Sequence, residues 1–134
     1  MSPPLARPLA AGATVGILGG GQLGRMLAMA AARLGLRTAI YEPAADCPAA
    51  GLAGRHFAAA YDDAGALGEF ARACDVVPYE FENVPVAAAE AIAALTPVLP
   101  GPNALAVSQD RLAEKTFLRD LGIATAPFFA VDSA

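Results

Sequence analysis

The feature of this 134-residue sequence that most constrains its fold is a cluster of glycines, GGGQLG, between a short apolar run and an expected helix. Gly19, Gly21 and Gly24 have the spacing G-x-G-x-x-G, in which glycines allow a tight turn from a strand into a helix. The free N–H groups at the start of such a helix can bind an anion. These residues, 19–24, are called the glycine loop below, and they predict a strand–turn–helix unit with an anion-binding end.

Expected strands and helices alternate along the chain. Short apolar or β-branched runs predict strands, and apolar residues at helical spacing predict helices between them. The expected strands are Thr14–Leu18, Arg37–Glu42, Arg55–Tyr61, Val76–Tyr79 and a fifth within residues 97–102, and the expected helices run from the glycine loop to Gly35, from Asp62 or Asp63 to Cys74, and over Val86–Leu95. This alternation predicts an α/β fold with a Rossmann-like, doubly wound parallel sheet.

The first expected helix has a recognisable apolar face. Leu23, Leu27 and Leu34 fall on it, together with Ala30 or Ala31. Apolar residues at this spacing usually face the core. We therefore expect the three leucines to be buried against the sheet.

The sequence predicts three parts. Residues 1–13 are rich in Pro and Ala and are expected to be a flexible extension, and residues 14–107 are expected to form the Rossmann-like domain. Residues 108–134 are expected to hold a linker helix that ends at Gly122 and the start of another domain. A new apolar segment, FFAV, begins only a few residues before Ala134. We therefore expect the chain to be part of a larger protein.

Composition argues against several classes of function. A formal net charge of -4 gives no basic surface for nucleic acid, and no apolar run approaches the ~20 residues of a membrane helix. Cys47 and Cys74 belong to no CxxC or Cys/His cluster, so we expect free thiols in a reducing, cytoplasmic compartment. His56, the one histidine, is expected to be structural. The sequence predicts no metal site and no catalytic residue within this chain.

The glycine loop by itself leaves several interpretations open. Glu42 follows Gly24 by 18 residues, where dinucleotide-binding folds place the acid that binds ribose, so one interpretation is a nicotinamide site. A purely structural glycine turn is another. A nucleoside triphosphate site of the P-loop type is disfavoured, because Arg25 and Met26 replace the Lys and the Ser/Thr that contact phosphate and magnesium.

Two acids follow the fourth expected strand, in the motif YEFENVP. Glu80 and Glu82 are expected at the carboxyl edge of the sheet, where the glycine loop also lies and where ligands of open α/β sheets bind. We expect only one of the two acids to face the crevice. Alternatively, both acids are solvated or cap the next helix.

A basic row follows in QDRLAEKTFL. Arg111, Lys115 and Arg119 are spaced i, i+4, i+8 on the expected linker helix, while Ala113 and Phe117 belong to its apolar face. A solvated row is the ordinary explanation. An arginine that faces a phosphate is the functional alternative.

The motifs GILGGGQLGRML, YEFENVP and QDRLAEKTFL together resemble the amino-terminal part of the 5-(carboxyamino)imidazole ribonucleotide synthase family, ATP-grasp enzymes of purine biosynthesis. The resemblance runs from about Thr14 to the last residue and includes CPAAGLA and ATAPF in the expected order. The formate-dependent glycinamide ribonucleotide transformylases share this layout, but GQLGRM and YEFENV favour the synthase family.

The resemblance implies an ATP-dependent ligase that uses ATP and Mg to convert 5-aminoimidazole ribonucleotide and bicarbonate into 5-carboxyaminoimidazole ribonucleotide, ADP and phosphate. It also implies a cytoplasmic homodimer whose first, pre-ATP-grasp domain is Rossmann-like without a nicotinamide. The ATP-grasp lysines, the phosphate lid and the magnesium carboxylates are expected beyond Ala134. The present chain alone is therefore expected to be inactive.

The resemblance also assigns site residues. It places Gly21, Gln22 and Leu23 of the glycine loop and Glu80 against the substrate, and Arg111 against ATP. A carboxylate accepts hydrogen bonds from ribose hydroxyls but repels a phosphate, so Glu80 is expected at the sugar and the loop N–H groups at the phosphate. A non-catalytic binding or assembly module and a nicotinamide-dependent oxidoreductase fragment remain the alternatives.

Overall fold

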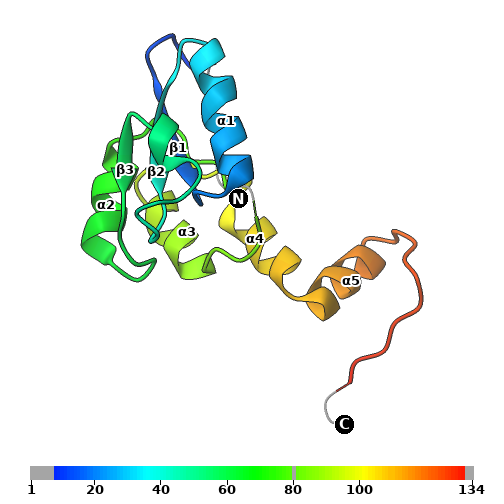
Figure 1. Ribbon diagram of the computed structural model, residues 1–134. Coiled ribbons are helices and arrows are strands. Elements are labelled where there is room, and N and C mark those ends of the chain that lie inside the picture. Colours follow the sequence, from blue (N-terminus) through cyan, green and yellow to red (C-terminus); the bar gives the residue numbers. More distant parts are fainter. Residues whose placement is uncertain (1–7, 80, 132–134) are drawn as a thin grey trace.

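The computed structural model describes residues 8–79 and 81–131, and it has the expected α/β architecture (Figure 1). Its parallel sheet has the order β1-β2-β3. The strands are β1 (Thr14–Leu18), β2 (Arg37–Tyr41) and β3 (Arg55–Phe57), and the helices are α1 (Gln22–Arg33), η1 (Ala50–Leu52), α2 (Ala64–Arg72), α3 (Val86–Ala93), α4 (Pro102–Gln109) and α5 (Arg111–Asp120).

The fourth and fifth expected strands are present only as single bridges. Val76 and Tyr79 pair in parallel with residues of β1, and Val77 pairs with Val98. The prolines at 78 and 97 have no N–H to donate, so a continuous ladder cannot form there. These bridges nevertheless extend the sheet beyond β1, on the side opposite β2.

This arrangement creates a reversal of strand order beside β1. The chain moves from β1 to β2 to β3 in one direction and then returns to the other side of β1 with residues 76–79. Ligands of open α/β sheets bind outside the carboxyl ends of the strands at such a reversal. The glycine loop follows β1 at that point.

Helices cover both faces of the sheet (Figure 1). Successive residues of a strand point to opposite faces, and Ile17 accordingly packs with Ala28 of α1 while Leu18 packs with Phe70 of α2 and Ile92 of α3. All of these side chains are buried. The two faces of the sheet therefore support two apolar clusters, of which the one under α2 and α3 is the larger.

Of the apolar face expected on α1, Ala31 is buried but the three leucines are exposed. Leu23 and Leu34 are 54% and 73% exposed, and the buried residues are Gly24, Ala28 and Ala31. Small side chains let the helix lie close to the sheet, whereas leucines in these places would hold it away. Hydrophobic periodicity predicts that the leucines are buried, but close packing against the sheet instead buries the glycine and the alanines.

Residues 8–13 are joined to the sheet near its start. Gly12 donates its N–H to Gly35 (2.8 Å), and Arg37 donates its N–H to Ala13 (2.8 Å). Residues 1–7 of the expected flexible extension lie outside the described residues. The attachment to the sheet thus begins before β1 itself.

Helix α4 is not among the expected helices. Pro102 begins the helix, as proline often does, and Leu105 is completely buried in the larger cluster. The amide of Gln109 donates to the carbonyl oxygens of Glu82 and Val84. Helix α4 is therefore packed onto the sheet domain, whereas α5 has no buried residue and projects away from the sheet in Figure 1.

Candidate functional site at the glycine loop

The candidate site lies where β1 ends beside residues 76–79. Leu18, the last residue of β1, bridges to Tyr79, and its N–H donates to Pro78 (3.0 Å). The glycine loop and the YEFENVP segment thus leave neighbouring positions of the sheet at the same edge. The structure confirms that these two motifs, 60 residues apart in the chain, share one end of the fold.

The conformation of the loop explains three of its glycines. Gly19 has φ +107°, a region that other residues rarely adopt. A Cβ atom on Gly24 would lie 2.6 Å from the carbonyl oxygen of Gly19, and one on Gly20 would lie 2.4 Å from Cys47 Sγ. The loop therefore requires glycine for its turn, for the approach of α1, and for its contact with the residues behind it.

The start of α1 is open to solvent and has no side-chain cap. Gly21 is the N-cap residue, with no side chain to accept from the first turn, and that turn contains no acidic residue. Gln22 and Leu23 are exposed, and the first N–H groups of any α-helix lack partners within it. The loop thus presents N–H groups and the positive end of the helix dipole to an anion.

The side chain of Arg25 does not enter this site. Its Nη1 donates to the carbonyl oxygen of Pro48 at 2.9 Å, on the loop that follows β2. The residue that stands where a P-loop has its lysine is therefore engaged in holding two loops together. This agrees with the expectation that the motif is not a P-loop.

Glu42 points inward, behind the glycine loop. Its Oε2 accepts hydrogen bonds from the N–H of Gly20 (3.1 Å) and the hydroxyl of Tyr61 (3.3 Å), and its Oε1 accepts from the N–H of Ala44 (3.3 Å). The backbone oxygen of Glu42 lies 3.0 Å from Nε2 of His56, which gives this histidine the expected structural contact. The carboxylate that a dinucleotide-binding fold would offer to ribose is therefore already engaged within the protein.

Of the two acids of YEFENVP, the structure describes only Glu82. Glu80 lies outside the described residues, so its expected contact with a substrate stays a prediction. Glu82 is exposed, and only its backbone oxygen has a described partner, the amide of Gln109. Tyr79, which precedes them, donates its hydroxyl to the carbonyl oxygen of Gly101 (3.3 Å) and ties this edge to the start of α4.

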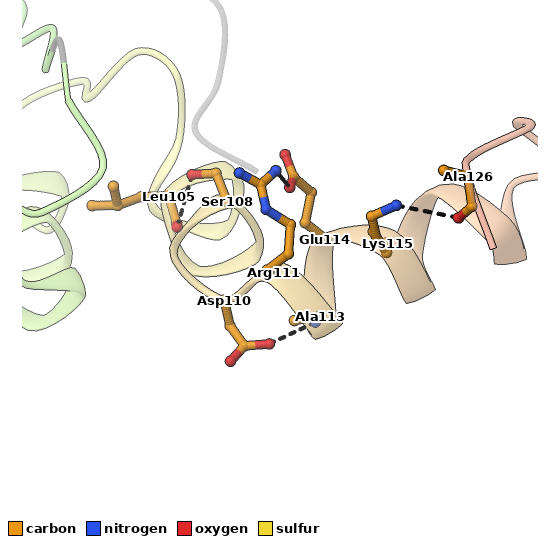
Figure 2. Close-up of polar contacts among 8 residues, drawn as sticks. All are labelled: Leu105, Ser108, Asp110, Arg111, Ala113, Glu114, Lys115 and Ala126. Carbon is orange, nitrogen blue, oxygen red and sulfur yellow. Dashed lines mark hydrogen bonds and ion pairs between the residues drawn. The ribbon is translucent and has the colours of Figure 1, made fainter. Parts of the chain in front are cut away.

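The cations of the basic row on α5 have different partners, and Figure 2 shows those of Arg111 and Lys115. Arg111 begins the helix, has an 80% exposed side chain and forms an ion pair with Glu114. Lys115 donates to the carbonyl oxygen of Ala126 (3.2 Å), and both Lys115 and Arg119 lie 5.5 Å from the centre of the Phe128 ring. Lys115 and Arg119 thus contact the segment that follows α5, whereas Arg111 lies at the junction with α4.

The structure thus groups Gly21, Gln22 and Leu23 at one helix start and leaves Arg111 on a separate element. Sequence reasoning did not identify the internal role of Glu42, nor the part played by Tyr61. The one available signal was the position of Glu42 at the end of β2, and it suggested a ligand contact instead. Nothing in the local sequence of Tyr61 indicates its partner.

The Cys74 thiol keeps its proton at neutral pH. Burial, and secondarily the charge of Asp75, raises the pKa of the Cys74 thiol to about 12, and Cys47 is buried beneath the glycine loop. Both are free thiols.

Within residues 8–79 and 81–131, no group of three or more His, Cys, Asp or Glu side chains could hold a metal ion. No helix in this part of the chain is both long and apolar enough to cross a membrane.

Comparison with known proteins gives a consistent result. Residues 12–109 match the family model described as the ribonucleotide synthetase preATP-grasp domain. The N5-carboxyaminoimidazole ribonucleotide synthase of Brucella melitensis is 62% identical over 121 residues, which are 90% of this chain and 33% of that protein. The corresponding Staphylococcus aureus enzyme (strain MRSA252) is 41% identical over 120 residues, covering 90% of this chain and 32% of its own length. The chain thus spans about a third of the length of these relatives.

Solved structures agree with the sequence comparison. N5-carboxyaminoimidazole synthetase from Staphylococcus aureus, complexed with ADP, superimposes with a TM-score of 0.88 at 38% identity, over 94% of this chain and 34% of that one. The Aspergillus clavatus enzyme, in complex with ADP and 5-aminoimidazole ribonucleotide, gives a TM-score of 0.78 at 34% identity, over 87% of this chain and 31% of that one.

Proposed function

Because this chain belongs to the ribonucleotide synthetase preATP-grasp family, and corresponds to the amino-terminal portion of N5-carboxyaminoimidazole ribonucleotide synthases, we propose that it is the domain that binds 5-aminoimidazole ribonucleotide. The complete enzyme that carries it would be an ATP-dependent ligase of purine biosynthesis. ATP and bicarbonate would form carboxyphosphate and ADP. The exocyclic amine of the substrate would then capture the carbon dioxide released with phosphate.

The observation that carries this proposal is the open start of α1 at the strand-order reversal. Uncapped N–H groups and the helix dipole suit the phosphate of a phosphoribosyl compound. We assign this contact to Gly21, Gln22 and Leu23, the residues at the N-cap and in the first turn of α1. A relative with the same fold in this region has been solved with 5-aminoimidazole ribonucleotide and ADP, which supports this choice of substrate.

We assign the ribose hydroxyls to Glu80. The preceding residue, Tyr79, bridges to Leu18 immediately before the glycine loop, so a substrate whose phosphate lies at α1 has its sugar within reach of this edge. A carboxylate accepts hydrogen bonds from hydroxyl groups and repels a phosphate. This polarity orients the substrate along the edge of the sheet, with its base away from α1.

Residues 108–134 have a different role in the proposal. We divide the chain after residue 107 and interpret the remainder as a linker helix and the beginning of an ATP-grasp domain. Arg111 is the proposed ATP contact, because it is a cation at the junction whose side chain is largely exposed and, among the residues that the structure describes, pairs only with Glu114 on its own helix. ATP and Mg would supply the phosphoryl chemistry, through residues that the relatives carry in the remaining two thirds of their length.

Calorimetric titration tests the binding role directly. The chain should bind 5-aminoimidazole ribonucleotide and should show no heat above dilution with NADH or NADPH, because Glu42 is engaged with Gly20 and Tyr61. Ribose 5-phosphate serves as the matched ligand without the aminoimidazole. Binding of either nicotinamide at micromolar concentration, or no binding of the ribonucleotide, would contradict the proposal.

A further inference from the structure

Three donors converge on the carboxylate of Glu42, and one of them belongs to the glycine loop. The N–H of Gly20 lies 3.1 Å from Oε2, in the turn directly before the start of α1. A Cβ atom on Gly20 would lie 2.8 Å from Cβ and Cγ of Glu42, so the loop rests on this side chain. The position of the loop is thus set from behind by residue 42.

The carboxylate is itself held from a third segment. Tyr61, after β3, donates its hydroxyl to the same Oε2 atom at 3.3 Å. Its ring lies 5.7 Å from that of Tyr41, whose own hydroxyl donates to the carbonyl oxygen of Ala60 (2.6 Å). The ends of β1, β2 and β3 are therefore connected through Glu42.

The hydroxyl of Tyr61 keeps its proton in this arrangement. Burial raises the pKa of Tyr61, and the neighbouring charge of Glu42 raises it further. The tyrosine therefore stays protonated at neutral pH and remains a donor to the carboxylate. A hydrogen bond to an ionised acceptor is stronger than one between neutral groups.

We propose that Glu42 is a positioning residue for the phosphoribosyl substrate. Its carboxylate accepts hydrogen bonds from the N–H of Gly20 and the hydroxyl of Tyr61, and these bonds hold the glycine loop where the start of α1 meets the substrate phosphate. Glu42 does not touch the substrate. This inference rests on the proposed function of the loop and assigns that site a supporting residue.

The test uses Glu42→Ala, Glu42→Gln and Tyr61→Phe in this chain. Glu69→Gln is the matched control, because it removes one carboxylate charge from α2, where Glu69 forms an exposed ion pair with Arg55 of β3 (3.5 Å). Two measurements are made on each variant. Amide hydrogen exchange of Gly20 reports the loop contact, with Gly54, whose N–H donates to the backbone oxygen of Thr38 (2.9 Å), as internal reference. Titration with 5-aminoimidazole ribonucleotide reports the site.

In Glu42→Ala, the amide of Gly20 should exchange faster while that of Gly54 is unchanged, and affinity for the ribonucleotide should fall about tenfold or more, as expected when a charged acceptor is lost. Glu42→Gln should keep part of the Gly20 protection and part of the ribonucleotide affinity, because its amide carbonyl oxygen can still accept a hydrogen bond from Gly20. Tyr61→Phe should have a smaller effect in the same direction. Glu69→Gln should match the wild type.

Two outcomes overturn the inference. One is a Gly20 amide that is released in Glu42→Ala without loss of ribonucleotide affinity. The other is an affinity loss accompanied by faster exchange at Gly20 and Gly54 alike, which is the result of general destabilisation. A wild-type chain that protects Gly20 through Glu42 but binds no ribonucleotide would instead refute the proposed function, and the inference with it.

Discussion

Residues 14–109, which run to the end of α4, and the segment from Asp110 to Val131 form helices by the same local rules but differ in how tightly those helices are packed. Helices α2 and α5 both begin with an aspartate that caps the first turn. Helix α2 then buries Leu67, Phe70 and Ala71, whereas α5 buries no side chain. A sequence that is sufficient to form a helix is therefore not sufficient to make that helix part of a core.

The largest effect is expected from a comparison of two leucines that lie seven residues apart. Leu105 on α4 is completely buried, and Leu112 on α5 is 42% exposed. Leu105→Ala should lower the free energy of unfolding by about 2–5 kcal/mol, from lost burial and the cavity left behind. Leu112→Ala should change it by about 0.5 kcal/mol or less. Denaturant unfolding followed by circular dichroism measures both, and equal effects would remove the distinction between the two regions.

A functional test of the first region uses Glu80 and Glu82. In the complete enzyme, Glu80→Gln should raise the KM for 5-aminoimidazole ribonucleotide about tenfold or more, because a hydrogen bond to a charged group is worth roughly 1.5–3 kcal/mol. The KM for ATP should hardly change. Glu82→Gln, at an exposed position, should be close to neutral. A larger substrate defect for Glu82→Gln in a folded protein would reverse the assignment of the two acids.

The second region has its own functional test in Arg111 and Arg119. Arg111→Ala in the complete enzyme should raise the KM for ATP by the equivalent of about 1.5–3 kcal/mol, through loss of a charge-assisted contact. Arg119→Ala should do much less, since Arg119 lies beside Asp120 and the Phe128 ring. Steady-state kinetics at saturating ribonucleotide separates the two, and equal changes would identify the basic row as solvated surface.

The smallest expected effect compares the two helix caps. Asp63 accepts from the N–H of Ala66 (2.9 Å), and Asp110 accepts from the N–H of Ala113 (2.7 Å). Loss of such a cap costs about 1 kcal/mol of helix stability. Asp63→Ala should lower the stability of the whole domain by about that amount, while Asp110→Ala should only loosen α5. Thermal melts give the first quantity, and amide exchange along α5 gives the second. A fall in the global melting temperature with Asp110→Ala would show that α5 unfolds together with the sheet.

Much of the candidate site was predicted from local pattern. The glycine loop, its place between β1 and α1, and its shared edge with YEFENVP all follow from spacing and the parallel arrangement of strands. The sequence left the role of Glu42 open, because a carboxylate at this position can serve either a bound ribose or the loop itself. The choice depends on Gly20 and Tyr61, which lie about twenty residues away on either side.

The sequence by itself determined the alternation of strands and helices from β1 to α2, the glycine turn after β1, and a helix start at Asp62 or Asp63, because each depends on neighbours within a few residues. Only the tertiary structure decided which face of α1 is buried, that Leu105 belongs to the core, and that Glu42 supports the glycine loop. The physical reason is that close packing and the hydrogen bonding of a partly buried carboxylate such as Glu42 depend on segments far apart in the chain. Hydrophobic periodicity cannot tell a face that packs through Gly24, Ala28 and Ala31 from one that displays leucines to solvent.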